Sequence, residues 1–144
     1  MSINMSGPRI PLTEFFCGVS IPSMAWEVEY TDEFEGWWGS LDEEEQASVA
    51  ASVRLLEERG PNLRYPHSSG IEGSRHGHMR ELRTQHEGRP YRTLYAFDPR
   101  RTAILLLGGE KTGNDDWYEE FVPKADALYD EHLEELKREQ EGDA

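Results

Sequence analysis

Four charged residues near the middle of the chain have types and spacing that suit proton transfer and phosphate binding: Glu81, Arg83, Arg92 and Lys111. Glu81 and Arg83 are two positions apart, so on a β-strand their side chains share one face at about 6–7 Å separation. A carboxylate beside cations stays ionised and can accept a proton, while the cations stabilise negative charge developing on a phosphate. The same residues could instead form cross-strand ion pairs on the surface of a sheet, without a role in catalysis.

Three predicted strands carry these residues or lead to them. The strands cover residues 79–86, 91–97 and 102–107, and short turns rich in Gly, Pro and charged residues separate them. Such turns join neighbouring strands, so we expect an antiparallel meander.

The register across the two turns decides how close the charges come. If His86 faces Tyr91 and Phe97 faces Thr102, the three cations gather at one end of the sheet, with a register error of one or two residues allowed. We expect Arg92 to be exposed there, at the end of its strand.

The remaining elements predict a small α+β domain. Trp26, Val28 and Tyr30 alternate with acidic residues, which indicates a strand with one buried face. Thr31 is the expected N-cap of a first helix, and Ser40 with a glutamate three residues later predicts a capping box for a second helix. The predicted order is strand, helix, helix, three-stranded meander and a final helix.

The final helix has its expected first turn at Pro123, because proline suits that position. We expect residues 1–24 to be a poorly ordered extension, residues 25–137 to form the domain, and residues 138–144 to be a frayed acidic tail.

A long loop, residues 61–77, precedes the meander and is rich in Gly, Ser, Pro and His. Loops of this length often carry function. His67, His76 and His78 could ligate a metal, but neither a cysteine nor a carboxylate has a recognisable ligand spacing to complete such a site. The sequence therefore predicts neither a metal nor a cofactor.

The formal net charge of −14 argues against a nucleic-acid partner, because phosphate contacts need Lys and Arg. The charge is unevenly spread, however. Residues 1–60 and 114–144 each hold 12 acidic against 3 basic residues, whereas residues 61–113 hold 9 basic against 5 acidic residues. The middle is thus net positive. Acidic helix faces flanking an ordinary sheet would give the same distribution.

A single cysteine, Cys17, excludes an intramolecular disulfide, and the apolar run at residues 15–21 is too short for a membrane span. We therefore expect a cytoplasmic protein without membrane contact.

Three local strings, in this order of elements, resemble the RelE/ParE toxin superfamily and look closest to its phage-derived HigB-like branch. They are MRELR at 79–83, GRPYRTLYAF at 88–97 and ILLLGGEKT at 104–112, and the resemblance spans about residues 24–136. It implies the toxin of a type II toxin-antitoxin pair. Such toxins are usually metal-independent endoribonucleases that cut mRNA on the ribosome, through attack of the ribose 2′-hydroxyl, and inhibit translation. A helix-turn-helix antitoxin is the implied partner.

The resemblance also assigns roles to the four charged residues. Arg92 matches the arginine that holds the scissile phosphate. Glu81 and Arg83 occupy the strand that supplies basic and proton-transfer groups, and Lys111 falls where the family places another cation.

Two departures from the family pattern concern proton transfer. RelE carries lysines on the strand where this chain has Met79 and Glu81. It also uses a tyrosine near the start of the final helix, where a gap-free match places Val122. Tyr118 or His86 are the candidate substitutes.

Further contacts to RNA are predicted at basic and aromatic residues of the same region. They are Arg75, His76, Arg80, His86, Arg89 and Tyr91. Because the chain is acidic overall, two alternatives stay open: a ParE-like toxin that poisons DNA gyrase without cutting nucleic acid, and an inactive binding protein of the same fold.

Overall fold

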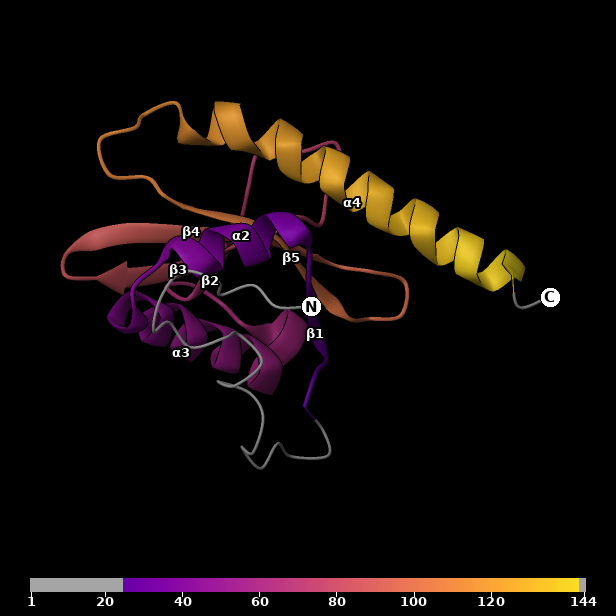
Figure 1. Ribbon diagram of the computed structural model, residues 1–144, viewed down its shortest axis with the longest axis horizontal. Coiled ribbons are helices and arrows are strands. Elements are labelled where there is room, and N and C mark those ends of the chain that lie inside the picture. The colour runs from indigo at the N-terminus through magenta and orange to yellow at the C-terminus, as the bar shows by residue number, and fades with distance from the viewer. Residues whose placement is uncertain (1–24, 143–144) are drawn as a thin grey trace.

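In the computed structural model, which describes residues 25–142, a five-stranded sheet lies between helices (Figure 1). The elements are β1 (Val28–Tyr30), α2 (Asp32–Ser40), α3 (Glu43–Arg59), the 3₁₀ turn η1 (Gly60–Asn62), β2 (Ser68–Gly70), β3 (Arg80–His86), β4 (Arg89–Phe97), β5 (Ala103–Glu110) and α4 (Trp117–Gly142). The predicted α+β class and order are confirmed, with β2 as an additional short strand. The predicted extension at residues 1–24 lies outside the described residues.

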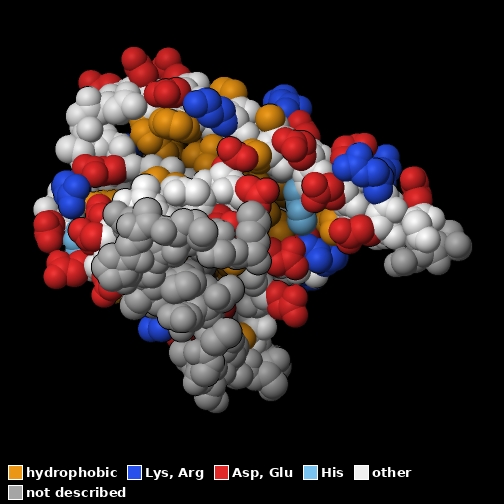
Figure 2. All heavy atoms as spheres, viewed as in Figure 1, with side chains coloured by type: hydrophobic (Ala, Val, Ile, Leu, Met, Phe, Trp, Pro, Cys, Tyr) orange, Lys and Arg blue, Asp and Glu red, His pale blue; other side chains and the backbone are white. Residues whose placement is uncertain are grey.

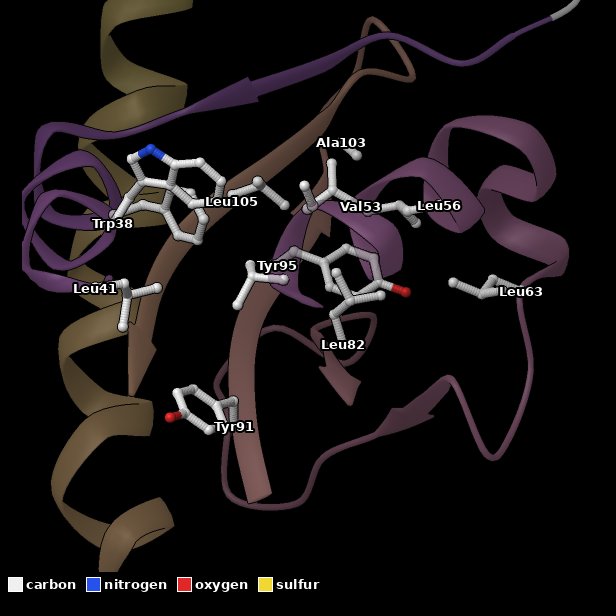
Figure 3. Close-up of a cluster of buried hydrophobic side chains, with 13 residues drawn as sticks. Trp38, Leu41, Val53, Leu56, Leu63, Leu82, Tyr91, Tyr95, Ala103 and Leu105 are labelled. Atoms are coloured by element: carbon white, nitrogen blue, oxygen red, sulfur yellow. The ribbon is translucent and has the colours of Figure 1, made fainter. Parts of the chain in front are cut away.

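The sheet has the strand order β1-β5-β4-β3-β2, in which β1 runs parallel to β5 and the other neighbours are antiparallel. Because side chains alternate between the two faces of a strand, each face has its own core. Leu82, Tyr95 and Leu105 pack toward α2 and α3 (Figure 3). Leu94 and Leu106 pack on the opposite face, which α4 covers (Figure 1).

The helix starts follow local capping. The Thr31 side chain accepts a hydrogen bond from the Phe34 amide at 3.1 Å, as predicted. The capping box of α3 is formed by Asp42 and Glu45, and not by Ser40 as the sequence predicted. The reciprocal bonds of Asp42 and Glu45 satisfy both amides, whereas Ser40 belongs to the last turn of α2.

The hairpin between β3 and β4 is tighter than predicted. His86 faces Arg89 and not Tyr91. Glu87 and Gly88 form a two-residue turn with positive φ angles of 51° and 77°, the conformation that suits the twist of a hairpin. The register therefore moves by two residues, and Arg83 directly faces Arg92.

The pairing of β4 with β5 also differs from the prediction. Phe97 faces Ala103, and an irregularity between Leu94 and Tyr95 shifts the register, so that Arg92 faces Gly109. The predicted neighbourhood of Arg92 with Leu107 is thus wrong by two residues, since a bulge cannot be read from the strand pattern alone.

Helix α4 begins six residues before Pro123, the residue predicted to lie in its first turn. The additional turn is held by packing, because Trp117 is buried and its ring centre lies 5.0 Å from that of Phe121. The helix also continues through residues 138–142, where the sequence predicts fraying, and its end projects beyond the sheet (Figure 1). No helix in the described part of the chain is long and apolar enough to cross a membrane.

Asp98, in the turn after β4, ties this turn to α4 and to β1. Its buried carboxylate lies 2.8 Å from His132 Nε2 and accepts hydrogen bonds from the Arg100 guanidinium and the Thr102 amide. Arg100 also bonds to Glu29 at 2.8 Å. Burial alone would raise the pKa of Asp98, but the hydrogen bonds from His132, Arg100 and Thr102 outweigh it and lower that pKa below its usual value.

We predict that Asp98→Asn lowers the free energy of unfolding by about 2–4 kcal/mol at pH 7, because it removes one charge of a buried cluster. The pKa of Asp98 is lower in the folded than in the unfolded chain. Its stabilisation is therefore complete above the unfolded pKa of about 3.9 and is lost as the pH falls through the folded pKa.

Urea denaturation between pH 3 and pH 7 measures this difference. The exposed Asp115, changed to Asn, is the matched control and should have no effect. A deficit for Asp98→Asn that is unchanged at the acidic end would contradict the assignment.

Candidate active site on the α4 face of the sheet

Glu81, Arg83 and Arg92 share the face of the sheet that α4 covers. Glu81 directly faces Leu94, which packs against α4, and Arg83 directly faces Arg92 on the same side. Glu81 Oε1 lies 3.4 Å from Arg92 Nε, and Glu81 Oε2 lies 3.1 Å from Arg83 Nη1. One carboxylate thus bridges two guanidinium groups from neighbouring strands.

Tyr118, in the first turn of α4, completes this cluster. Its hydroxyl donates a hydrogen bond to Glu81 Oε1, and Ser69 Oγ donates another to Oε2 at 2.6 Å. The Lys111 Nζ lies 5.0 Å from the centre of the Tyr118 ring. The structure therefore brings the four predicted catalytic residues together and adds a tyrosine.

Burial raises the pKa of the Tyr118 phenol above its usual value, and the hydrogen bond to Glu81 raises it further, while a hydrogen bond with Arg92 acts in the opposite direction. Tyr118 is therefore protonated at neutral pH. In this state it can donate a proton, and Glu81 is positioned to accept one.

Exposure differs sharply within the cluster. The side chains of Glu81 and Arg92 are each only 6% exposed, whereas that of Arg83 is 27% exposed. The expectation of an exposed Arg92 at the end of its strand is wrong, because Arg92 lies inside β4 and α4 covers this part of the strand. Gly109 faces Arg92, and a Cβ atom there would lie 2.9 Å from Trp117 Nε1, which shows how closely α4 approaches.

Arg92 is incompletely bonded despite its burial. Its Nη1 donates to the Tyr91 carbonyl at 3.0 Å, while its Nε has no hydrogen-bond partner among the described residues. The contact of Nε with Glu81 is a charge interaction without hydrogen-bond geometry. A buried donor of this kind is costly to leave unpaired.

The places of Val122, His86 and Tyr118 in the fold decide which residue can substitute for the family tyrosine. Val122 is buried in the core between α4 and the sheet, as the helical repeat requires. His86 lies on the opposite face, with its Nδ1 2.8 Å from Ser48 Oγ of α3. Tyr118 lies one helical turn before Val122 and contacts Glu81 directly. Sequence spacing could have selected it only if the approach of α4 to β3 were known.

Two of the predicted RNA contacts lie on the loop before β3, away from the cluster. The side chains of Arg75 and His76 both contact Asp130 of α4, and His76 Nε2 lies 2.8 Å from Asp130 Oδ1. The pKa of Asp130 is lowered first by the hydrogen bond with Arg75 and then by that with His76. These residues attach the loop to α4, so their charges are already paired in this structure.

The other predicted RNA contacts lie elsewhere. Arg80 Nε donates to Ser68 Oγ at 3.0 Å, and Arg89 forms an ion pair with Glu110 at 3.0 Å. Tyr91 is only 1% exposed and packs in the core below α2 and α3 (Figure 3). Its side chain therefore cannot reach a nucleic acid without unfolding. Contacts to RNA by the remaining residues stay predictions.

The predicted alternative of a metal held by loop histidines is not assembled in the described residues. His76 is bonded to Asp130, and His78 Nε2 lies 3.1 Å from the Tyr129 hydroxyl. Ligand atoms that come within 4.8 Å of one another are found instead at Glu44, His86 and Glu87, on the turn beside α3. This group does not include a residue of the Glu81 cluster.

Comparison with known families assigns the chain. The model of the phage-derived Gp49-like proteins (DUF891) matches residues 36–130, which include the complete cluster around Glu81. The chain belongs to this Gp49-like family. No solved structure matches it significantly.

Two proteins of Mycobacterium tuberculosis (strain ATCC 25618 / H37Rv) are similar to this Gp49-like chain. "Putative toxin HigB2" is 39% identical over 117 residues, which cover 80% of this chain and 58% of the relative. "Putative toxin HigB3" is 44% identical over 93 residues, which cover 64% of this chain and 80% of the relative. The HigB-like relationship predicted from the three strings is thus confirmed, although the match spans little more than half of HigB2.

The burial of Glu81 and Arg92 leads to a prediction about the free energy of unfolding. We predict that Arg92→Ala lowers the free energy of unfolding by about 3–5 kcal/mol, because it leaves the Glu81 carboxylate buried beside fewer charges. Arg83→Ala should cost less than about 1 kcal/mol, because Arg83 is partly solvated. Chemical denaturation of both variants at neutral pH measures the difference. Equal losses for the two arginines would contradict the assigned burial.

Proposed function

We propose that this protein is the toxin of a type II toxin-antitoxin pair and that it cleaves mRNA without a metal. The observation that carries the proposal is the meeting of one carboxylate, three cations and a protonated tyrosine where β3, β4 and the end of β5 meet the first turn of α4. The similarity to proteins named as HigB toxins supports the toxin role.

In the proposed reaction, Glu81 accepts the proton of the ribose 2′-hydroxyl, whose oxygen attacks the adjacent phosphorus. The new bond joins O2′ to phosphorus, and the bond from phosphorus to O5′ breaks. Tyr118 donates its proton to the departing O5′. The products are a 2′,3′-cyclic phosphate and a 5′-hydroxyl end. The hydrogen bond between Tyr118 and Glu81 then offers a direct route for returning the proton to the tyrosine.

The cations have complementary roles in this scheme. We assign contact with the phosphate to Arg83 and Lys111, since Arg83 is partly exposed and Lys111 directly follows β5. Arg92 lies beside Glu81 and adds positive charge beneath the reacting group. Together they provide the charge stabilisation that a metal provides in other nucleases.

The proposed partners follow from this role. The substrate is mRNA, engaged during translation in the cytoplasm, and the protein that neutralises the toxin is a helix-turn-helix antitoxin. Because the chain has a net charge of −14, and the face shown in Figure 2 carries many Asp and Glu with Lys and Arg in small separate groups, general attraction to RNA should be weak. Binding then depends on the few cations of the site.

We predict that uncontrolled expression arrests growth and produces new RNA fragments with 5′-hydroxyl ends. Tyr118→Phe should slow cleavage by about 10²–10⁴-fold, because it removes the proposed proton donor and retains the ring. Tyr30→Phe, on β1 away from the cluster, is the matched control and should cut normally. Sequencing of RNA 5′ ends after induction measures both.

Intact mRNA together with double-strand breaks in DNA would contradict this proposal and would indicate poisoning of gyrase. Toxicity that is unchanged in a folded Arg83→Ala/Lys111→Ala variant would also contradict it, because that variant lacks both cations that the proposal assigns to the phosphate.

We predict that the chemistry does not use a protein-bound metal. The purified protein should contain less than one equivalent of metal by mass spectrometry, and Glu81→Gln should abolish cleavage. The double variant His76→Ala/His78→Ala should only weaken cleavage, since these residues attach the loop to α4. Stoichiometric zinc, or an active Glu81→Gln beside an inactive histidine double variant, would move the chemistry to the loop.

A further inference from the structure

A groove of about 480 Å³ lies beside the candidate active site, where the edge of β3 passes α3. It is lined by Ser48, Ala51, Ser52, Leu55, Pro66, His67, Arg83, Thr84, Gln85 and Arg92. β2 pairs with β3 as far as Leu82, and the His67 carbonyl accepts a hydrogen bond from the Arg83 amide at 2.8 Å, so the β3 edge is open only beyond Arg83. The volume lies within the range of roughly 300–1,000 Å³ that is usual for small-molecule sites.

The groove shares two arginines with the candidate active site. Arg83 bonds to Glu81 and also lines the groove. Arg92 also lines the groove, although its side chain lies on the α4 face beside Glu81. A molecule that places an anionic group on Arg83 therefore has its neighbouring part at the mouth of the groove.

The remaining lining suits a flat, partly polar ring. Ala51, Leu55 and Pro66 provide apolar walls, while His67 and Gln85 provide hydrogen-bonding groups. Gln85 is exposed, and its amide can both donate and accept, which allows it to read the edge of a base.

Tyr65 stands at the rim of the groove, directly before Pro66. It is 71% exposed, and it is the one large hydrophobic side chain of the described residues that is strongly exposed. The Arg83 guanidinium carbon lies 5.0 Å from the centre of its ring. An exposed aromatic ring beside a cation is the usual platform on which a base of single-stranded RNA stacks.

We propose that this groove is a nucleobase subsite, which takes the base adjacent to the cleaved phosphate, with Tyr65 as the stacking residue. The inference rests on the proposed function and extends it. It assigns recognition of the base to the groove between the edge of β3 and α3. The phosphate on Arg83 and the base in the groove are then parts of one nucleotide.

Binding of uncleavable RNA tests the inference on the full chain. The probes are fluorescent 2′-O-methyl decamers of A, C, G or U, in which the attacking hydroxyl is blocked, and fluorescence anisotropy measures their affinity. Ala51→Trp fills the groove from an exposed position of α3 and should weaken binding by about tenfold or more. It should also change the base preference next to the cut in mapped RNA 5′ ends.

Matched controls separate the groove from general effects. Ala47→Trp places the same ring at an exposed position of α3 outside the groove and should behave as the wild type. Tyr65→Ala should weaken binding by about tenfold, whereas Tyr65→Phe should bind nearly normally because stacking needs only the ring. If Ala51→Trp fails to fold, the two variants of the exposed Tyr65 still test the inference.

The outcomes also separate this inference from the proposed function. If the wild type produces 5′-hydroxyl ends but the folded Ala51→Trp and Tyr65→Ala variants keep its affinity and base preference, the subsite is wrong and the nuclease stands. If the wild type neither binds nor cuts RNA, the proposed function itself is wrong. Variants that retain RNA binding but lose binding of the antitoxin would instead assign the groove to the protein partner.

Discussion

The arrangement of the site depends on the buried interaction of Glu81 with Arg92. A carboxylate that is 6% exposed must be compensated by charge and hydrogen bonds, and here the partners come from β3, β4, β2 and α4. The interaction therefore joins four elements at one point. It also holds the Glu81 carboxylate and the Tyr118 hydroxyl in contact, while Arg83 stays partly exposed. Stability and the proposed chemistry thus use the same groups.

The position of α4 decides whether Tyr118 reaches Glu81. Three sets of contacts hold the helix: Trp117 and Val122 pack on the sheet, Asp98 contacts His132, and the loop before β3 contacts Asp130. The basic loop residues that appeared suited to RNA from their types alone therefore serve the site indirectly. They fix the helix that carries the tyrosine.

The acidic composition is compatible with this local site. Most cations of the middle region have an acidic neighbour, as in the contacts of Arg89 with Glu110 and of Arg100 with Asp98 and Glu29. Positive charge is concentrated where β3, β4 and the end of β5 meet the start of α4. A chain of net charge −14 can in this way present a small cationic site without strong general attraction to nucleic acid.

The sequence by itself determined the order of elements, the shared face of Glu81 and Arg83, and the HigB-like relationship, because alternation and local strings are properties of neighbouring residues. The tertiary structure alone decided the rest. The two-residue turn at Glu87 and the bulge after Leu94 set the register, and the packing of Trp117 extended α4 backward to bring Tyr118 to Glu81. The burial of Arg92 and of Tyr91 followed from helices packing on opposite faces of the sheet, which the spacing within a single strand does not reveal.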